Sequence, residues 1–168
     1  FSSCKLKQIE FSKKSNLQII GKNAFCNTKL ERILLPSSVT EIGESAFFGC
    51  SNLTEFVIPD DSKLNIIGEY SFISLRITKI SIPSSVIEIR NNAFEFIYSL
   101  KQIEFSSDSN LQIIGSSLIT ETTIESFIIP SKVVEIQDGW CQSTPLLTEI
   151  KMIGKNENFI YYKDQFLL

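Results

Sequence analysis

The sequence predicts a repeat solenoid built mainly from β strands, and two observations predict it. The first is composition, because the 168 residues include 26 Ile, 23 Ser and 13 Phe but only 3 Ala. A chain that avoids the best helix former and uses a β-branched residue for many of its apolar positions favours extended segments. The second is an internal repeat with a period of 47 residues, since a fixed period of this size is typical of stacked repeats.

The repeat consists of two coils of unequal length. A motif of the form L-x-x-I-x-I begins every 47 residues, at Leu6, Leu53, Leu100 and Leu147. A second copy begins midway, at Leu30, Ile77 and Ile124. The unit is therefore a pair of coils of 24 and 23 residues. We call them long and short coils. A single coil cannot bury its apolar residues alone, so the coils are predicted to stack.

The L-x-x-I-x-I segments are predicted to be strands. Their fourth and sixth residues share one face, because side chains alternate along a strand. Strands stacked in register form a parallel sheet, with the fourth residues as a buried ladder: Ile9, Ile33, Phe56, Ile80, Ile103, Phe127 and Ile150. Proline follows the sixth residue four times and marks the strand end, at Pro36, Pro59, Pro83 and Pro130.

Two further columns describe the next corner of each coil, beyond the turn that the proline marks. Glycine follows isoleucine at Gly21, Gly43, Gly68 and Gly115, which indicates either a positive φ or close backbone packing. Arg90 and Gln137 replace this glycine in two coils. Alanine precedes phenylalanine at Ala24, Ala46 and Ala93, where the interior is predicted to be cramped, and Leu118 and Trp140 depart from that pattern.

The whole chain, 1–168, is predicted to be one domain. Residues 1–5 correspond to the tail of a preceding coil, 6–146 to six coils, and 147–168 to an irregular last coil with a hairpin. The chain begins with Phe1 and contains neither a signal peptide nor a long apolar run. We expect it to be a fragment of a longer protein.

Several chemistries are disfavoured by composition. The chain has no His, so it has neither a Ser-His-Asp triad nor a His metal ligand. Its net charge of −3 favours neither nucleic acid nor an anionic membrane. Its four cysteines, Cys4, Cys26, Cys50 and Cys141, are too scattered for a disulfide framework. We expect no enzymatic activity, no cofactor and no metal site.

Two segments carry a resemblance to a known family. They are LPSSVTEIGESAFFGCSNL, residues 35–53, and IPSSVIEIRNNAF, residues 82–94. They resemble the BspA-like leucine-rich repeat family, whose unit reads L-x-x-I-x-I-P-x-x-V-x-x-I-G-x-x-A-F-x-x-C-x-x-L. The resemblance implies a right-handed, curved leucine-rich-repeat stack with a parallel sheet on its concave face. It also implies a non-enzymatic surface or secreted protein that adheres to host cells, to matrix or to other microbes.

The concave face of the predicted sheet is the candidate binding surface. Its outward residues are the third and fifth of each coil, and the candidates are Arg32, Leu34, Glu55, Val57, Lys79, Ser81, Gln102 and Glu104. Leu34 and Val57 place apolar side chains on a face that is otherwise polar, which suits protein recognition. The alternative is that β propensity alone selects them. Asn52 heads a sequon with Leu53 and Thr54, a candidate glycosylation site if the protein is extracellular.

Three functional hypotheses follow. The first is an adhesin segment at the cell surface that recognises a protein or glycan on a host cell, matrix or another microbe. The second is a structural spacer in a surface stalk, and the third is a cytosolic protein-interaction scaffold. No nucleic-acid partner is expected, membrane contact is expected only through segments outside this chain, and self-association stays open.

Overall fold

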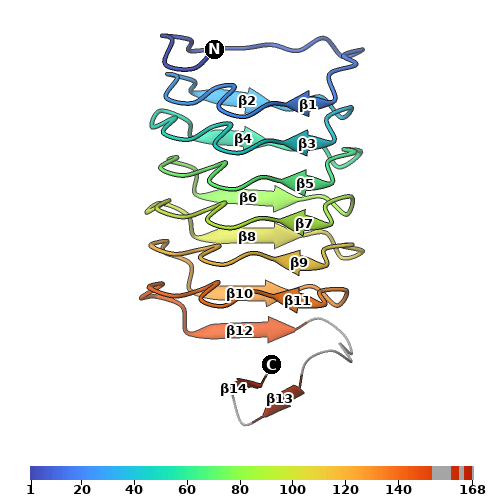
Figure 1. The fold of residues 1–168 in the computed structure, drawn as a ribbon, viewed down its shortest axis with the longest axis vertical. Coiled ribbons are helices and arrows are strands. Elements are labelled where there is room, and N and C mark those ends of the chain that lie inside the picture. The colour runs from blue at the N-terminus through green and yellow to red at the C-terminus, as the bar shows by residue number, and fades with distance from the viewer. Residues whose placement is uncertain (153–159, 163–164, 168) are drawn as a thin grey trace.

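The computed structural model describes residues 1–152, 160–162 and 165–167. It is a parallel β solenoid, and the described residues contain strands and turns without a helix (Figure 1). The predicted fold class is therefore confirmed. Nothing in the described part of the chain is a helix of the length and apolarity that crossing a membrane requires.

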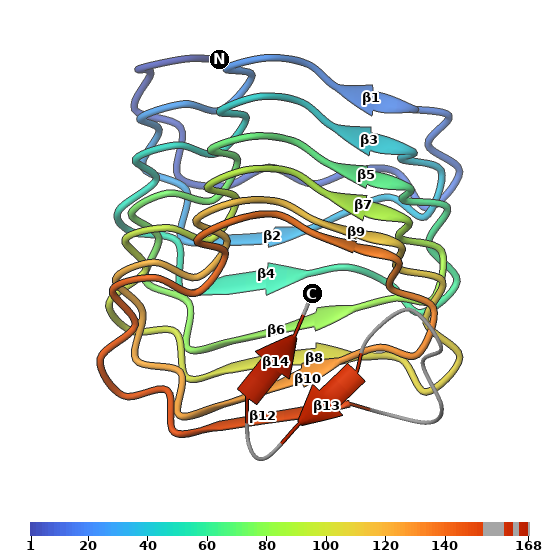
Figure 2. The same cartoon turned by 60° about the horizontal axis from the view of Figure 1, so that its bottom comes forward.

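Two sets of parallel strands form opposite walls of the stack (Figure 2). The first, which we call the long-strand face, comes from the L-x-x-I-x-I motifs: β2 (Arg32–Leu34), β4 (Glu55–Val57), β6 (Lys79–Ile82), β8 (Gln102–Phe105), β10 (Ser126–Ile129) and β12 (Glu149–Met152). The second, the short-strand sheet, comprises β1 (Ile19–Ile20), β3 (Glu41–Ile42), β5 (Ile66–Ile67), β7 (Glu88–Ile89), β9 (Ile113–Ile114) and β11 (Glu135–Ile136). Near the C-terminus, β13 (Ile160–Tyr162) pairs antiparallel with β14 (Gln165–Leu167).

The two walls differ in continuity. The short-strand sheet is a single six-stranded parallel sheet, which the sequence pattern did not predict. The long-strand face consists of three pairs, β2 with β4, β6 with β8 and β10 with β12. Every pair joins a short coil to the long coil after it, and the step from a long coil to the next short coil lacks a strand ladder. The first L-x-x-I-x-I motif, residues 6–11, is not a strand in the structure. It belongs to a long coil, and the next motif along the stack is β2 of a short coil, so the same missing ladder explains the difference.

The core consists of ladders with one residue from each coil. The predicted inward residues of the central strands are buried: Ile33, Phe56, Ile80, Ile103 and Phe127. Their counterparts Ile9 and Ile150 are partly buried, because each lies in a terminal coil. The sixth residues of the motifs form a second ladder beside the first. Four of them are buried: Leu35, Ile58, Ile82 and Ile129.

Stacked phenylalanine rings run through the core beside the turns. The rings of Phe25, Phe47, Phe72 and Phe94 lie nearly parallel, with neighbouring centroids 5.2, 6.0 and 5.2 Å apart. Phe56 inserts its edge against both Phe47 and Phe72, at 5.0 and 4.7 Å. The stack ends where Ile119 and Cys141 replace phenylalanine. Trp140, which stands where other coils have alanine, packs on Phe127 with ring centroids 4.9 Å apart. The larger side chain is therefore partly buried against the core.

Close packing, not a positive φ, explains three of the four glycines that follow isoleucine, Gly43, Gly68 and Gly115, whereas a Cβ on Gly21 in the first coil would have no atom within 4 Å. A Cβ on Gly68 would lie 2.6 Å from the Ile42 carbonyl oxygen of the preceding coil, and one on Gly115 would lie 2.5 Å from backbone atoms. At Gly43, in a short coil, the nearest atom would be 2.9 Å away. The backbone of the preceding coil is therefore slightly farther away in this short coil than in the long coils of Gly68 and Gly115. Side chains stand at the same position in the two other short coils, as Arg90 and Gln137.

A positive φ occurs elsewhere in the same turns. Each complete turn has two residues in the left-handed backbone region, four positions apart, and neither is the glycine that follows isoleucine. The first column contains Asn23, Ser45, Tyr70, Asn92, Ser117 and Gly139, and the second contains Asn27, Gly49, Ser74, Phe96, Glu121 and Ser143. Small or polar residues predominate because this conformation penalises bulky side chains. Amides within these turns bond to carbonyls of the next coil, for example Phe25 N to Ala46 O at 2.8 Å, so the turns form a third hydrogen-bonded side.

The four cysteines are all free thiols. Cys50 is buried, and its thiol donates to the Phe25 carbonyl oxygen at 3.0 Å and lies 3.2 Å from the Thr28 hydroxyl. Burial raises the pKa of the Cys50 thiol, so this group stays protonated at neutral pH. Cys50 therefore serves as a small core residue, in agreement with its place in the repeat.

Ser71 offers a test of the cramped column that precedes phenylalanine. Its side chain is fully buried and its hydroxyl has no hydrogen-bond partner, whereas Ala46 and Ala93 hold the same position in adjacent coils. An unsatisfied buried hydroxyl destabilises a fold. We expect Ser71→Ala to raise the free energy of unfolding by about 1 kcal/mol, measured by urea denaturation. The matched control is Ser62→Ala, which removes the acceptor of the Leu64 amide at 3.1 Å and should lower stability. A loss of stability in both variants would contradict this interpretation.

Candidate binding surface

The pair β2 and β4 brings four of the predicted residues together. Their register places Arg32 opposite Glu55 and Leu34 opposite Val57. The Arg32 Nε lies 3.1 Å from the Glu55 Oε2. Leu34 is 53% exposed, because its strand has one face toward the core and the other toward solvent. The sequence-predicted mixed patch of apolar and charged side chains is therefore contiguous on this strand pair.

The other four predicted residues form a polar network on β6 and β8. Lys79 pairs with Gln102 and Ser81 with Glu104 in the strand register. The Glu104 carboxylate lies 2.7 Å from Lys79 Nζ and accepts from Ser81 Oγ at 3.3 Å and from Gln102 Nε2 at 3.0 Å. Hydrogen bonding from Lys79 lowers the pKa of the Glu104 carboxyl. This carboxylate is therefore already satisfied, which distinguishes the polar network from the patch on β2 and β4.

The ion pair on β2 and β4 is poorly placed to stabilise the fold. The Arg32 and Glu55 side chains are 66% and 51% exposed, and exposed pairs contribute only about 0.2–1 kcal/mol. Leu34 likewise leaves more than half of its surface in water. These side chains remain accessible to a partner, which is the property that a recognition surface needs.

Asn52, the candidate glycosylation site, lies in the turn that leads into β4. Its side chain is exposed, as is that of Thr54, while Leu53 between them is fully buried. The Thr54 hydroxyl donates to the Glu31 carbonyl oxygen at 3.3 Å. The sequon is thus accessible at the edge of the long-strand face.

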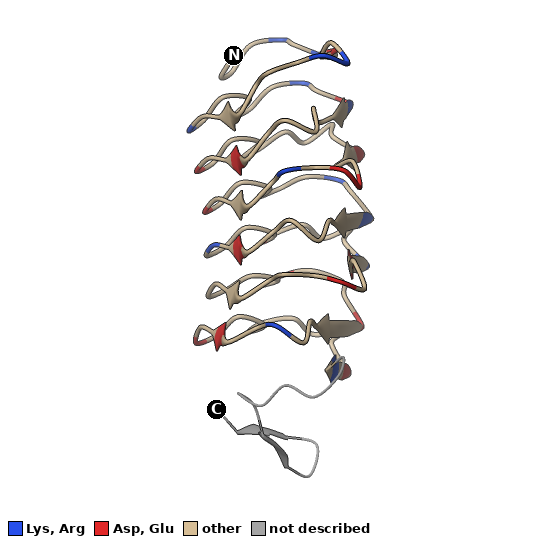
Figure 3. Ribbon diagram, turned by 90° about the vertical axis from the view of Figure 1, so that its right-hand side faces the viewer, with Lys and Arg blue, Asp and Glu red and all other residues tan. Residues whose placement is uncertain are grey.

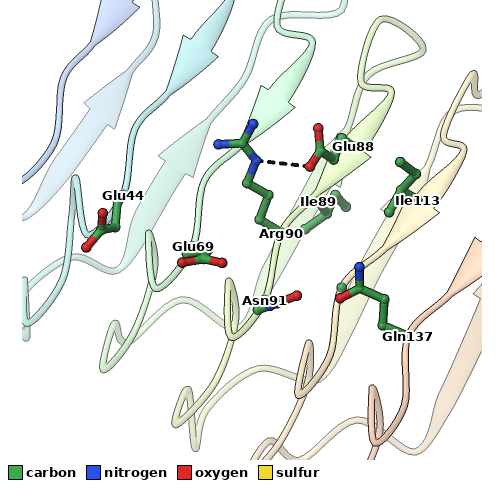
Figure 4. Close-up of a pocket in the computed structure, with 9 residues that line it drawn as sticks. Glu44, Glu69, Glu88, Ile89, Arg90, Asn91, Ile113 and Gln137 are labelled. Carbon is green, nitrogen blue, oxygen red and sulfur yellow. Dashed lines mark hydrogen bonds and ion pairs between the residues drawn. The ribbon is translucent and has the colours of Figure 1, made fainter.

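A shallow pocket of about 330 Å³ lies beside the short-strand sheet, where β7 and β9 end (Figure 4). Its charged lining residues are Glu44, Glu69, Glu88 and Arg90. Two of these carboxylates have ion-pair partners, Glu44 with Lys22 at 2.8 Å and Glu88 with Arg90 at 3.0 Å. We call this hollow the acidic pocket. Among the described residues, no group of three His, Cys, Asp or Glu side chains is arranged to hold a metal ion.

Sequence analysis missed a second set of exposed side chains. Four aromatic residues lie along the turns that lead from the short-strand sheet back to the long-strand face, on the left in Figure 1. They are Phe48, Tyr70, Phe96 and Tyr98, on three successive coils. We call them the aromatic edge. Their signal in the sequence was available, because Tyr70 and Phe96 occupy columns in which the other coils have asparagine, serine, glycine or glutamate.

Charges of both signs are distributed along the stack. Figure 3 shows acidic and basic residues interspersed over the edge that faces the viewer, consistent with the small net charge of −3. Neither sign of charge dominates this edge.

Comparison with known proteins agrees with this architecture. A family model described as a BspA type leucine rich repeat region matches six copies over residues 1–95. The solved structure of the pneumococcal vaccine antigen PcpA is 22% identical with a TM-score of 0.76, covering 89% of this chain and 39% of that one. No curated protein matches the sequence.

Two further solved structures are similar. A leucine rich cell surface protein from Faecalibacterium prausnitzii is 24% identical with a TM-score of 0.63, covering 89% of this chain and 46% of that one. The leucine rich repeat protein of T. pallidum is 24% identical with a TM-score of 0.65, covering 79% of this chain and 73% of that one. These identities establish the fold alone. This chain spans less than half the length of the first two proteins.

Proposed function

The chain belongs to the BspA-type leucine-rich repeat family, and from this premise we propose that it is a protein-binding module exposed at a cell surface. We further propose that it acts in adhesion, by recognising a protein on a host cell, in extracellular matrix or on another microbe, and not as an enzyme. The similarity to a bacterial cell surface protein and to a vaccine antigen supports a surface location.

The observation that carries the proposal is the patch formed by Arg32, Leu34, Glu55 and Val57. An aliphatic pair on a solvated strand face, flanked by a weakly stabilising ion pair, has the composition of a small protein-recognition centre. More than half of the Leu34 surface lies in water, and the exposed Arg32–Glu55 pair contributes only about 0.2–1 kcal/mol to stability. The ordered strand pair presents all four side chains without further rearrangement, which limits the entropy cost of binding.

Adhesion of the purified chain tests this proposal. The chain would be applied to cultured epithelial cells and to surfaces coated with a panel of extracellular-matrix proteins. We expect Leu34→Asp to weaken any binding by about tenfold or more, because it places an unpaired charge at the centre of the patch. Arg32→Ala and Glu55→Ala should each weaken binding by smaller factors.

The matched control is Val134→Asp, which introduces the same charge at a similarly exposed residue outside the long-strand face. Binding that survives substitution of all four patch residues would overturn the assignment to this face. A chain that binds nothing while a longer protein containing it adheres would instead support the structural spacer.

A further inference from the structure

Basic side chains are concentrated in the first coils of the stack. Residues 1–32 contain seven of the 16 basic residues and two of the 19 acidic residues, a net charge of +5. The rest of the chain contains nine basic and 17 acidic residues, a net charge of −8. The small net charge of the whole chain therefore conceals an asymmetry along the stack, and a local excess of one sign attracts ligands of the opposite sign.

Five exposed cations occupy two adjoining positions of the repeat, where the turns on the left in Figure 1 lead into the long-strand face. Lys5, Lys29 and Arg76 stand directly before the first residue of a motif. Lys7 and Lys101 stand directly after such a residue. We call these five residues the basic row. Because they recur at the same places in successive coils, they follow the axis of the stack.

Backbone hydrogen bonds hold the entry segments of neighbouring coils side by side. The Glu31 amide donates to the Lys7 carbonyl oxygen at 3.2 Å, and the Arg76 amide donates to the Leu53 carbonyl oxygen at 3.0 Å. Neighbouring parallel strands are about 4.8 Å apart, so the first five entry segments span roughly 19 Å. This length exceeds a single small anion and matches a stretch of a linear polymer.

The protein does not neutralise the basic row. None of its five cations makes an ion pair with another described residue. Lys5 and Lys29 are one coil apart, which is less than the Debye length of about 8 Å at physiological ionic strength, so their potentials add. At the same two positions of the first five motifs, Glu31 is the only carboxylate. The row therefore presents an uncompensated positive potential to solvent.

The places between the cations are filled by neutral polar side chains: Asn52, Thr54, Thr78 and Ser99. None of the ten residues at these two positions of the first five motifs is apolar. A protein partner binds mainly through aromatic and other large side chains that enter well-packed pockets, and the row has no apolar side chain to receive them. A sulfated carbohydrate needs only cations and hydrogen-bonding groups, which the row supplies.

We propose that the basic row binds a sulfated polysaccharide, whose chain lies along the axis of the stack across the turns that enter the long-strand face. Lysine is a compact cation on a flexible stem, so it can follow sulfate groups at varied positions along such a chain. The choice of a polysaccharide over a nucleic acid, another linear polyanion, rests on the proposed location at a cell surface. Protein binding by the patch on β2 and β4 is a separate property.

Binding of heparin to the full chain tests the proposal by isothermal titration calorimetry. The chain is produced without N-glycosylation, because a glycan on Asn52 would cover the row. Fully desulfated heparin and a single-stranded oligonucleotide are the comparison ligands. We expect heparin alone to bind tightly, and its affinity to fall by about tenfold or more between about 50 and 200 mM sodium chloride.

Two double variants separate the basic row from the overall charge. Lys5→Ala with Lys29→Ala removes two neighbouring cations of the row and should weaken heparin binding by about fivefold or more. Lys13→Ala with Lys14→Ala is the matched control, because it removes the same charge from two exposed lysines of the first coil at the turn beyond the motif. Its effect should stay within about twofold. Glu31→Gln should strengthen binding. Circular dichroism and urea denaturation check that every variant is folded.

Three results would overturn the proposal. The first is a wild-type chain that does not bind heparin, or binds desulfated heparin equally well. The second is an equal loss of affinity in the two double variants, which would assign binding to the overall charge. The third is an oligonucleotide that binds as tightly as heparin. The adhesion assay with Leu34→Asp uses protein-coated surfaces and a different part of the chain, so a failure of either proposal can be told from a failure of the other.

Discussion

Phe72→Ala is expected to lower the free energy of unfolding by about 3–5 kcal/mol, the largest effect of any single substitution considered for this chain. Phe72 is fully buried and stacks against Phe47 and Phe94 in the coils on either side, while Phe56 meets its ring edge-on. Truncation would leave a cavity at the junction of three coils. Urea denaturation followed by circular dichroism measures the loss.

The control for Phe72 is Phe48→Ala. Phe48 has the same side chain and lies in an adjacent coil, but 37% of its surface is in water, so its truncation should cost far less. A repeat stack is stabilised by contacts between neighbouring coils, and the phenylalanine stack is one of those contacts. Equal losses in the two variants would show that the stacked rings do not carry the stability assigned to them.

Gly68→Ala is expected to lower the free energy of unfolding by about 1–3 kcal/mol. The new methyl group would lie 2.6 Å from the Ile42 carbonyl oxygen and 2.9 Å from the Glu44 nitrogen, so two coils would have to separate. Because backbone atoms are involved, a rotamer change cannot relieve the contact. Thermal and urea denaturation both report the change.

Gly21→Ala is the matched control for this substitution. Gly21 holds the same position in the first coil, where a Cβ would have no atom within 4 Å, so its effect should stay within about 0.5 kcal/mol. Gly43→Ala should fall between them, since its closest approach is 2.9 Å. The predicted order is therefore Gly68, Gly43, Gly21, and the reverse order would contradict close packing as the cause.

The inward residues of the long strands could be predicted from the sequence, because the six-residue motif is long enough to show alternation between apolar and polar positions. The L-x-x-I-x-I motif identifies which side chains point inward, and Ile33, Phe56 and Ile80 are buried as expected. The short-strand sheet escaped prediction because each of its strands has two residues, too few to show alternation. The gaps in the long-strand face also escaped, since all seven motifs look alike in sequence.

The sequence predicted which residues of the candidate surface are neighbours across strands, but not which side chains form hydrogen bonds and ion pairs. Counting along the motif places Arg32 beside Glu55 and Leu34 beside Val57, and the register agrees. Side-chain conformation was needed to find the Glu104 network with Lys79. The aromatic edge could not be predicted in the same way, because Tyr70 and Phe96 lie in turns whose backbone conformation the motif does not specify.

The unequal continuity of the two walls has a mechanical consequence. Across the steps from long to short coils, the entry to the long strands is held by one backbone hydrogen bond each, Glu31 to Lys7, Arg76 to Leu53 and Thr123 to Leu100. The short-strand sheet is unbroken over the same steps. Bending that spreads the long-strand face therefore strains few hydrogen bonds, while bending the opposite way stretches a continuous ladder. Tension along the axis of the stack is therefore carried by the short-strand sheet and by the hydrogen-bonded turns, and the long-strand face opens first at the steps from long to short coils.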